Sequence, residues 1–199
     1  MMTKPLVVLI IMIIASCTAT PKEASTYKVG QIITPHGEML IWLYDETPTH
    51  KSSFIALASA SYWDSLSFNR VIEGFVIQGG CPDTPEGFSD SPYLLSPEFN
   101  DSLKHVYGAV GAGRDNNPQK LSAGCQFYIV HDREGIPRLD ENYTVFGQVF
   151  KGLETLDKIA TLETDSLDAP LELVNLDVNI IELTEAQLKD NGFELKKDS

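Results

Sequence analysis

The chain has few positively charged residues and no visible cluster of metal-binding side chains. Its 199 residues include 15 Lys and Arg against 28 Asp and Glu, which gives a net charge of −13. Because phosphate backbones attract clustered Lys and Arg, this balance argues against a nucleic-acid partner. The four histidines lie far apart, and none of the three cysteines belongs to a C-x-x-C pair. The sequence therefore predicts no metal site, no redox motif and no cofactor.

The chain also lacks the usual marks of covalent catalysis. It has no glycine-rich phosphate-binding loop, no readable pair of nucleophile and base, and no internal repeat. These absences favour either a reaction that makes and breaks no covalent bond or a binding function. The length suits one domain with short appendages, and we expect a monomer.

The amino terminus has the pattern of a targeting segment. An apolar run covers residues 6–14 behind Lys4, and it is too short to span a bilayer as a helix. The following Ile14-Ala15-Ser16-Cys17 resembles a bacterial lipobox. We therefore interpret residues 1–17 as a lipoprotein signal peptide and Cys17 as the lipidated residue that anchors the chain to a membrane. The alternative is a plain secretory signal with an incidental cysteine.

The rest of the chain divides into a polar tether at residues 18–26, a domain at residues 27–184 and a charged tail or frayed helix at residues 185–199. Within the domain, short apolar segments read as strands, and Thr47-Pro48 has the pattern of a helix start. Leu153, Leu156 and Ala160 indicate a second short amphipathic helix. This pattern predicts a mainly β fold, either a barrel or a sandwich.

The rest of the chain is organised around the stretch at residues 68–80. It reads as two strands rich in β-branched residues, joined by a turn at Glu73-Gly74. Arg70 and Gln78 are polar residues near its two ends. A guanidinium is costly to bury without a partner, so Arg70 points either into solvent or into a groove where a ligand binds.

Three segments carry a resemblance to a known family. The string FNRVIEGFVIQGG at 68–80 resembles the signature of the cyclophilins, and SAGCQFYIV at 122–130 is similar to a second cyclophilin segment. A third similar segment is Leu139-Asp140 followed by YTVFGQV at 143–149. The resemblance covers residues 27–183. It implies an eight-stranded antiparallel β-barrel capped by two α-helices, and peptidyl-prolyl cis-trans isomerase activity.

The resemblance also implies a set of site residues. It gives Arg70, Phe75 and Gln78 catalytic roles. It implies that a second set of residues binds proline-containing polypeptides. These are Val76, Gly113, Gln126, Tyr128, Leu139 and Tyr143. For each apolar member, plain packing in the core is the alternative.

The chain departs from the family pattern at several of these positions. Val76 stands where the family commonly has Met, which shortens the expected pocket floor. Tyr128 replaces the more usual Phe and adds a hydroxyl that needs a partner. Cys81 and Cys125 both lie in segments expected near the groove, and we expect two separate buried thiols. A disulfide between them is the alternative in an oxidising compartment.

Two functional interpretations follow. The first is a lipid-anchored isomerase in the bacterial cell envelope, facing the periplasm, that assists folding of exported proteins. The second is a cyclophilin-like module that holds proline-containing segments, as a chaperone or scaffold, without useful turnover. Arg70 favours the enzyme because a scaffold does not need it, and a purely structural lipoprotein would leave this residue unexplained.

Arg138 generates a prediction about drug binding. It stands before the Leu-Asp pair, where many cyclophilins have a tryptophan associated with binding of cyclosporin. We expect weak cyclosporin affinity because the aromatic surface is absent. Calorimetric titration measures this affinity, and tight binding would contradict the prediction.

Overall fold

The computed structural model describes residues 24–64, 66–83, 88 and 92–195. The predicted signal peptide at 1–17, including Cys17, lies outside the described residues, as do residues 18–23 of the predicted tether.

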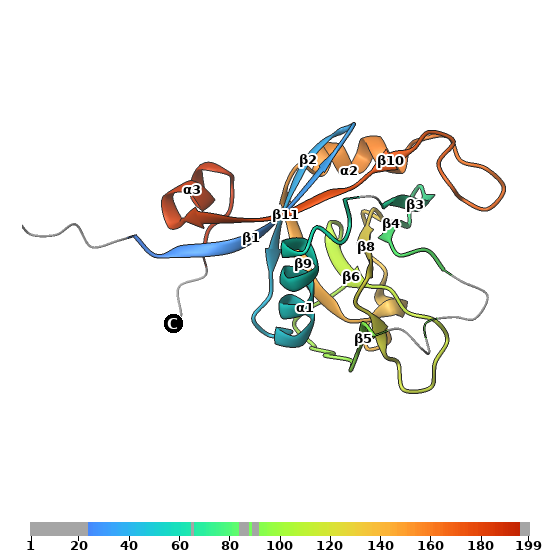
Figure 1. The fold of residues 1–199 in the computed structure, drawn as a ribbon, viewed down its shortest axis with the longest axis horizontal. Coiled ribbons are helices and arrows are strands. Elements are labelled where there is room, and N and C mark those ends of the chain that lie inside the picture. Colours follow the sequence, from blue (N-terminus) through green and yellow to red (C-terminus); the bar gives the residue numbers. More distant parts are fainter. Residues whose placement is uncertain (1–23, 65, 84–87, 89–91, 196–199) are drawn as a thin grey trace, which may run out of the picture.

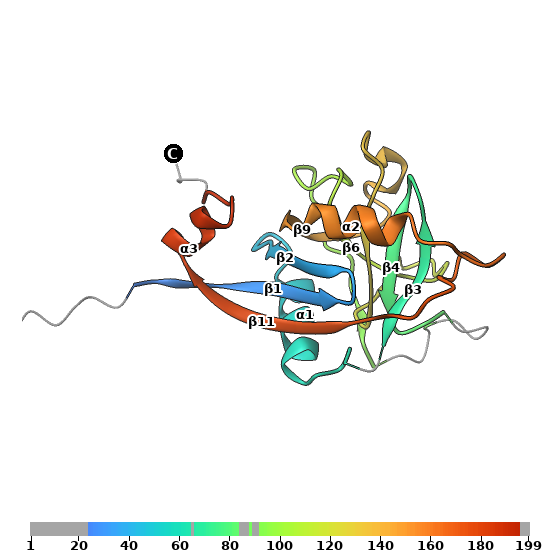
Figure 2. The same cartoon turned by 90° about the horizontal axis from the view of Figure 1, so that it is seen from above.

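The main body is one antiparallel sheet that curls into a barrel (Figures 1 and 2). Its strand order is β10-β3-β4-β8-β6-β9-β2-β1-β11. A separate two-stranded sheet pairs β5 with β7. The strands are β1 (Thr26–Thr34), β2 (Gly37–Leu43), β3 (Ser67–Ile72), β4 (Val76–Gly80), β5 (Leu94–Leu95), β6 (Ala109–Ala112), β7 (Ser122–Ala123), β8 (Gln126–Val130), β9 (Val145–Lys151), β10 (Val174–Asn175) and β11 (Asp177–Thr184).

The last strand closes the barrel. β10 and β11 stand at opposite ends of the strand order, yet only Leu176 separates them in the chain. β10 pairs with β3 and β11 pairs with β1. Leu176 is also hydrogen-bonded, since its main-chain N–H donates to the carbonyl of Leu66 at 2.9 Å. The predicted antiparallel barrel is confirmed. Its sheet has nine strands where eight were expected, because Leu176 divides the last strand into β10 and β11.

Two helices pack on the barrel as expected. α1 (Pro48–Ser59) buries Phe54 and Leu57, and α2 (Leu153–Ala160) buries Leu156 and Ile159. Thr47 is the N-cap position of α1 with Pro48 after it, so the predicted helix start is confirmed. Among the described residues, no helix is long and apolar enough to cross a membrane.

The capping of α1 differs from the sequence expectation. Thr47 makes no side-chain capping bond. Instead, the Glu98 carboxylate accepts from the main-chain N–H groups of Thr49 and His50 at 3.0 and 2.9 Å. A carboxylate is well placed there because the helix N-terminus carries a partial positive charge.

A third helix occupies the segment that we predicted as a charged tail or frayed helix. α3 (Glu185–Asp190) starts with a capping box between Thr184 and Gln187, and it buries Leu188. Phe193 after it stacks on Trp42 at 4.6 Å between ring centroids. In Figures 1 and 2, α3 lies beside the part of β1 and β11 that extends beyond the other strands. The described part of this tail is therefore packed against the domain, because its few apolar residues have aromatic partners.

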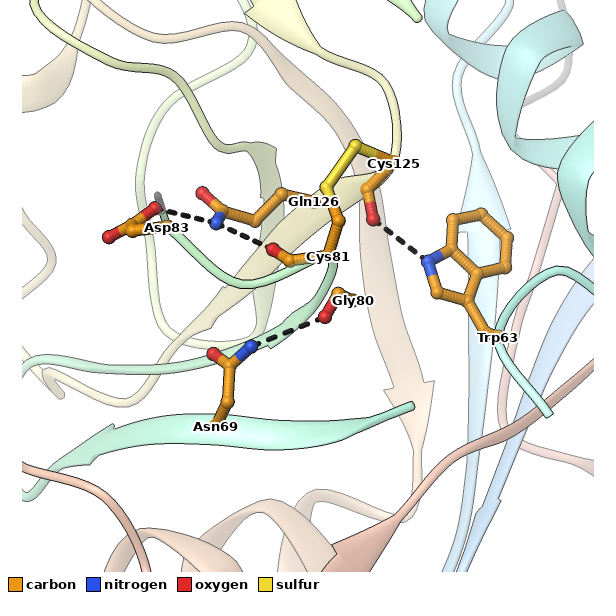
Figure 3. The surroundings of a disulfide bond; sticks show 7 residues. All are labelled: Trp63, Asn69, Gly80, Cys81, Asp83, Cys125 and Gln126. Atoms are coloured by element: carbon orange, nitrogen blue, oxygen red, sulfur yellow. Dashed lines mark hydrogen bonds between the residues drawn. A yellow bond between two sulfur atoms is a disulfide. The ribbon is translucent and has the colours of Figure 1, made fainter. Parts of the chain in front are cut away.

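The expectation of two separate thiols is wrong. Cys81 and Cys125 form a disulfide with a Cα–Cα distance of 5.5 Å (Figure 3). The strand register explains the pairing, because Gly80 of β4 lies opposite Gln126 of β8 and the cysteines are the next residues outward. The main-chain N–H of Cys81 also donates to the carbonyl of Cys125 at 3.0 Å. The sheet itself thus brings the two cysteines close enough for their Sγ atoms to bond.

The disulfide closes a long loop, with a sequence separation of 44. Replacing Cys125 with Ser should lower the free energy of unfolding by about 2–4 kcal/mol, since the unfolded chain regains that loop entropy. Urea unfolding measures the change.

A Cys17→Ser chain should show no reactive thiol when denatured without reductant and two after reduction. Two reactive thiols before reduction would contradict the pairing.

Candidate functional site

The site lies on the outer face of strands β4 and β8. Side chains alternate across the barrel wall, so Ile77 and Phe127 point into the interior core while Gln78 and Tyr128 point outward. Gln78 lies opposite Tyr128 in the β4–β8 ladder. The packed interior therefore supports a rigid outer surface on which polar and aromatic groups are set side by side.

A β-bulge in β3 places Arg70 on this outer face. Phe68 pairs with Gly79, and Arg70 pairs with Gln78. Two residue steps along β3 therefore stand opposite one step along β4, and Asn69 is the extra residue. In a regular strand Phe68 and Arg70 would share a face, and a guanidinium would enter the core. The bulge lets Phe68 stay buried inside while Arg70 turns outward beside Gln78. The side-chain amide of Asn69 donates to the carbonyl of Gly80 at 3.2 Å, which links β3 to β4 at the bulge (Figure 3).

One cavity of about 360 Å³ collects the predicted residues. Every site residue that we predicted between positions 70 and 143 lines it, and Cys17 lies outside the described residues. Sequence reasoning did not assign Asp83, Arg114 or Arg138 to the site. The complete lining is Arg70, Phe75, Val76, Gln78, Asp83, Gly113, Arg114, Gln126, Tyr128, Arg138, Leu139 and Tyr143.

The floor of the cavity is a small apolar basin. Val76, Tyr128 and Leu139 are buried there in a cluster separate from the barrel interior, and Phe75 and Tyr143 pack against them. Leu139 comes from a short 3₁₀ helix, η1 (Pro137–Leu139). The rings of Tyr128 and Tyr143 meet edge to face at 6.0 Å. These apolar residues therefore shape the cavity and do not belong to the interior core.

Arg70 reaches into the cavity from its edge. Its side chain is 37% exposed, and Nη1 donates to Oε1 of Gln78 at 3.4 Å. Nε lies 3.7 Å from Oδ2 of Asp168. A guanidinium has five N–H donors, and in the described part of the chain these two long contacts occupy few of them. Arg70 is thus oriented and still available to a ligand.

Sequence reasoning missed Asp168, which lies in the loop between α2 and β10. Its carbonyl accepts from the main-chain N–H of Val71 at 2.8 Å, and its own φ is +63°. This bond fixes the loop against β3 and brings the carboxylate to Arg70. No sequence signal links the two residues, because the contact depends on how the loop folds back.

The added hydroxyl of Tyr128 has the partner that the sequence called for. It lies 2.8 Å from Nε2 of His105, whose Nδ1 lies 2.7 Å from Oδ1 of Asp140. His105 is 2% exposed. The chain of bonds fits a neutral imidazole that donates to the carboxylate and accepts from the hydroxyl. The pKa of His105 is lowered, with burial as the largest cause, although Asp140 acts to raise it. Burial also raises the pKa of Tyr128 well above its ordinary value.

Gln126 spans the other end of the cavity. Its Nε2 donates to the carbonyl of Cys81 at 2.9 Å and to Oδ1 of Asp83 at 2.8 Å (Figure 3). Its amide oxygen lies directly against Gly113, where a β-carbon would collide with it. The Cys81 carbonyl, the Asp83 carboxylate and the close approach of Gly113 therefore together fix where this amide sits.

These features define a class of protein. An apolar basin stands beside a guanidinium and two amides, which suits an extended peptide with one small apolar side chain. Within the described residues, no group of three or more His, Cys, Asp or Glu side chains is placed to hold a metal ion. The site therefore has the features expected of a peptide-binding groove on the wall of a closed β-barrel.

Comparison with known proteins identifies the family. The model for "Cyclophilin type peptidyl-prolyl cis-trans isomerase/CLD" matches residues 29–181. The chain is 35% identical over 134 residues to peptidyl-prolyl cis-trans isomerase CYP18-1 of Arabidopsis thaliana, covering 66% of this chain and 81% of that protein. It is 37% identical over 132 residues to peptidyl-prolyl cis-trans isomerase-like 3 of Gallus gallus, covering 65% and 80%.

A solved structure agrees. The cyclophilin-type isomerase of Cryptosporidium parvum, determined in the presence of the dipeptide Ala-Pro, has a TM-score of 0.69 and 26% identity. The match covers 77% of this chain and 98% of that one. The chain belongs to the cyclophilin family of peptidyl-prolyl cis-trans isomerases.

The buried His105 predicts a pH dependence of stability. Its pKa is lower in the folded state than the ordinary value of about 6.5, so below that pH the unfolded chain binds more protons. Its contribution to stability is fully present above about pH 6.5 and is lost as the pH falls toward the folded-state pKa. Each such group changes the free energy of unfolding by at most about 1.4 kcal/mol per pH unit.

Urea unfolding between pH 8 and pH 5 tests this effect. A His105→Gln chain, with its folding at pH 8 verified by circular dichroism, should lose less stability over that range than the wild type. His50, whose pKa burial also lowers, leaves the variant with some slope. Identical slopes for the two proteins would show that His105 is not held neutral.

Proposed function

We propose that the chain accelerates rotation about X–Pro bonds in exported polypeptides as they fold. The observation that carries this proposal is the placement of Arg70, which the β3 bulge turns out of the core and beside the apolar basin. A partly exposed guanidinium donor next to a pocket of this kind suits a ligand that needs a hydrogen bond at the edge of the pocket.

The barrier to peptide rotation comes from amide resonance and amounts to about 18–20 kcal/mol. At the twisted geometry the lone pair returns to the proline nitrogen, which becomes a hydrogen-bond acceptor. A donor held near that nitrogen binds the twisted amide better than either planar form, and this difference is what lowers the barrier. In our proposal Arg70 is that donor, and no covalent bond is made or broken.

The rest of the cavity holds the substrate still while the bond turns. The apolar basin of Val76, Tyr128 and Leu139 takes the proline ring. The amides of Gln78 and Gln126 bind the backbone on either side, and Gly113 leaves room for the Gln126 amide. Because the Gln126 amide is already fixed by Cys81 and Asp83, little side-chain entropy is lost on binding.

The proposed setting is the bacterial cell envelope, facing the periplasm, with a lipid anchor at Cys17 and a monomeric domain. The lipobox-like sequence supports the anchor. The Cys81–Cys125 disulfide supports an oxidising compartment, since such bonds are rare where thiols are kept reduced.

A second candidate function is a binding module with little turnover. The Asp168 carboxylate favours it, because this group lies 3.7 Å from Nε of Arg70 and competes for the same donors. Val76 in place of a longer Met would also hold a proline ring less tightly.

Relaxation of an X–Pro tetrapeptide from cis to trans separates the two candidates. The wild type should accelerate exchange, and Arg70→Ala should lower kcat/KM by about a hundredfold, as expected when a transition-state donor is removed. Arg133→Ala is the matched control because this arginine contacts Tyr107 and Asp157, outside the cavity.

Circular dichroism shows whether each variant is folded. A folded wild type that is no faster than buffer would reject the isomerase proposal for that peptide, and peptide binding would then test the binding module. Equal rates for wild type and Arg70→Ala would reject the role of Arg70.

A further inference from the structure

The cavity carries positive charge on a strongly acidic protein. Three arginines line it, at positions 70, 114 and 138, although the chain as a whole has a net charge of −13. Asp83 is the carboxylate among the lining residues, and it accepts a hydrogen bond from Gln126. Charges at the mouth of a concave site act over a longer range than isolated surface charges, because the low-dielectric walls focus the field.

Arg114 is fixed in position by neutral acceptors, and no described carboxylate forms an ion pair with it. Its Nε donates to the carbonyl of Asn142 at 2.9 Å, and its Nη1 donates to the carbonyl of Asp115 at 2.8 Å. Both acceptors are neutral. The guanidinium carbon lies 4.5 Å from the centre of the Tyr143 ring, which forms one wall of the basin. In the described residues no carboxylate lies within ion-pair distance of Arg114.

The carboxylates of Asp115 and Asp140 have other hydrogen-bond partners. The Asp115 carboxylate accepts from the main-chain N–H of Phe88 at 3.0 Å and from the side chain of Asn117 at 2.7 Å. These bonds help to lower the pKa of Asp115, with a smaller contribution from Arg114. Asp140, behind the basin, is bonded to His105. The carboxylates of Asp115 and Asp140 thus already accept hydrogen bonds from other groups.

Arg138 stands on a different wall of the basin. It belongs to η1, is exposed, and has its guanidinium carbon 4.8 Å from the centre of the Phe75 ring. Within the part of the chain that the structure describes, it has no carboxylate at ion-pair distance either. Two cations that form no ion pair with a described carboxylate therefore flank the apolar basin, on the rings of Phe75 and Tyr143.

We propose that Arg114 and Arg138 select proline-containing segments that carry a carboxylate side chain immediately before or after the proline. This inference rests on the proposed isomerase function of the same cavity. A carboxylate bound there replaces the missing counter-charge, and it meets guanidinium groups whose orientation is already set. The competing explanation is that the two arginines only hold the aromatic walls in place, in which case every peptide would depend on them equally.

Matched peptides test the proposal. One tetrapeptide series varies the residue before proline among Glu, Gln and Lys, and a second series varies the residue after it. Isomerisation by the full chain is measured as kcat/KM after subtraction of the uncatalysed rate. We expect at least one series to favour Glu over Gln by about fivefold, with Lys below Gln, as for a partly exposed ion pair. The preference should shrink in 1 M salt, where the screening length is about 3 Å.

Variants assign the effect to particular residues. Arg114→Gln or Arg138→Gln should reduce the ratio of Glu to Gln toward one, while Arg133→Gln removes the same charge outside the cavity and should leave the ratio as it is. A loss of the ratio in all three variants would overturn the assignment, because net charge alone would then explain the preference. Equal rates for Glu, Gln and Lys in both wild-type series would overturn the proposal itself.

The failure of the isomerase function is distinguishable from the failure of this inference. If the wild type accelerates none of the peptides, calorimetric titration with the same Glu and Gln peptides still measures the preference. Tighter binding of the Glu peptide, lost in Arg114→Gln or Arg138→Gln, supports the selection without turnover. Equal affinities, or no binding of either peptide, reject it.

Discussion

Closure of the barrel by its last strand is the constraint on which the rest of the structure depends. Val174 and Asn175 complete the ladder of β3, and the residues after Leu176 complete that of β1. Without this bent strand β3 would be a sheet edge, with unpaired N–H and C=O groups along one side. Arg70, the proposed donor, lies on β3, so the same pairing that removes the edge also fixes the strand that carries it.

The two faces of the barrel wall divide the work between stability and function. Inward residues such as Ile77, Phe127 and Ile129 form the core, each fully or almost fully buried. Their outward neighbours on the same strands form the groove. Because a packed interior resists deformation, the outer side chains keep their positions without a large core of their own. The bulge at Asn69 is the local exception that lets one polar residue escape the inward pattern.

The sequence predicted those features that depend on local pattern or on a recognised motif. Hydrophobic spacing located the two helices of the barrel, and the family motifs named residues that now line one cavity. Features that depend on contacts between distant segments were missed. The cap of α1 comes from Glu98, 48 residues away from His50, and the cysteine pairing needed the β4–β8 register. The contact of Asp168 with Arg70 and the stacking of Phe193 on Trp42 likewise follow from tertiary structure alone.

The disulfide has a topological consequence. Together with the backbone from Cys81 to Cys125 it makes a covalent ring, and that ring contains β5, β6 and β7 as well as Gly113 and Arg114. A protease that cut the backbone once inside the ring would produce two fragments still joined through sulfur. Strand β6 would remain paired with β8 and β9, and the groove would keep both of its sides. Scission of the main chain there need not separate the molecule into pieces.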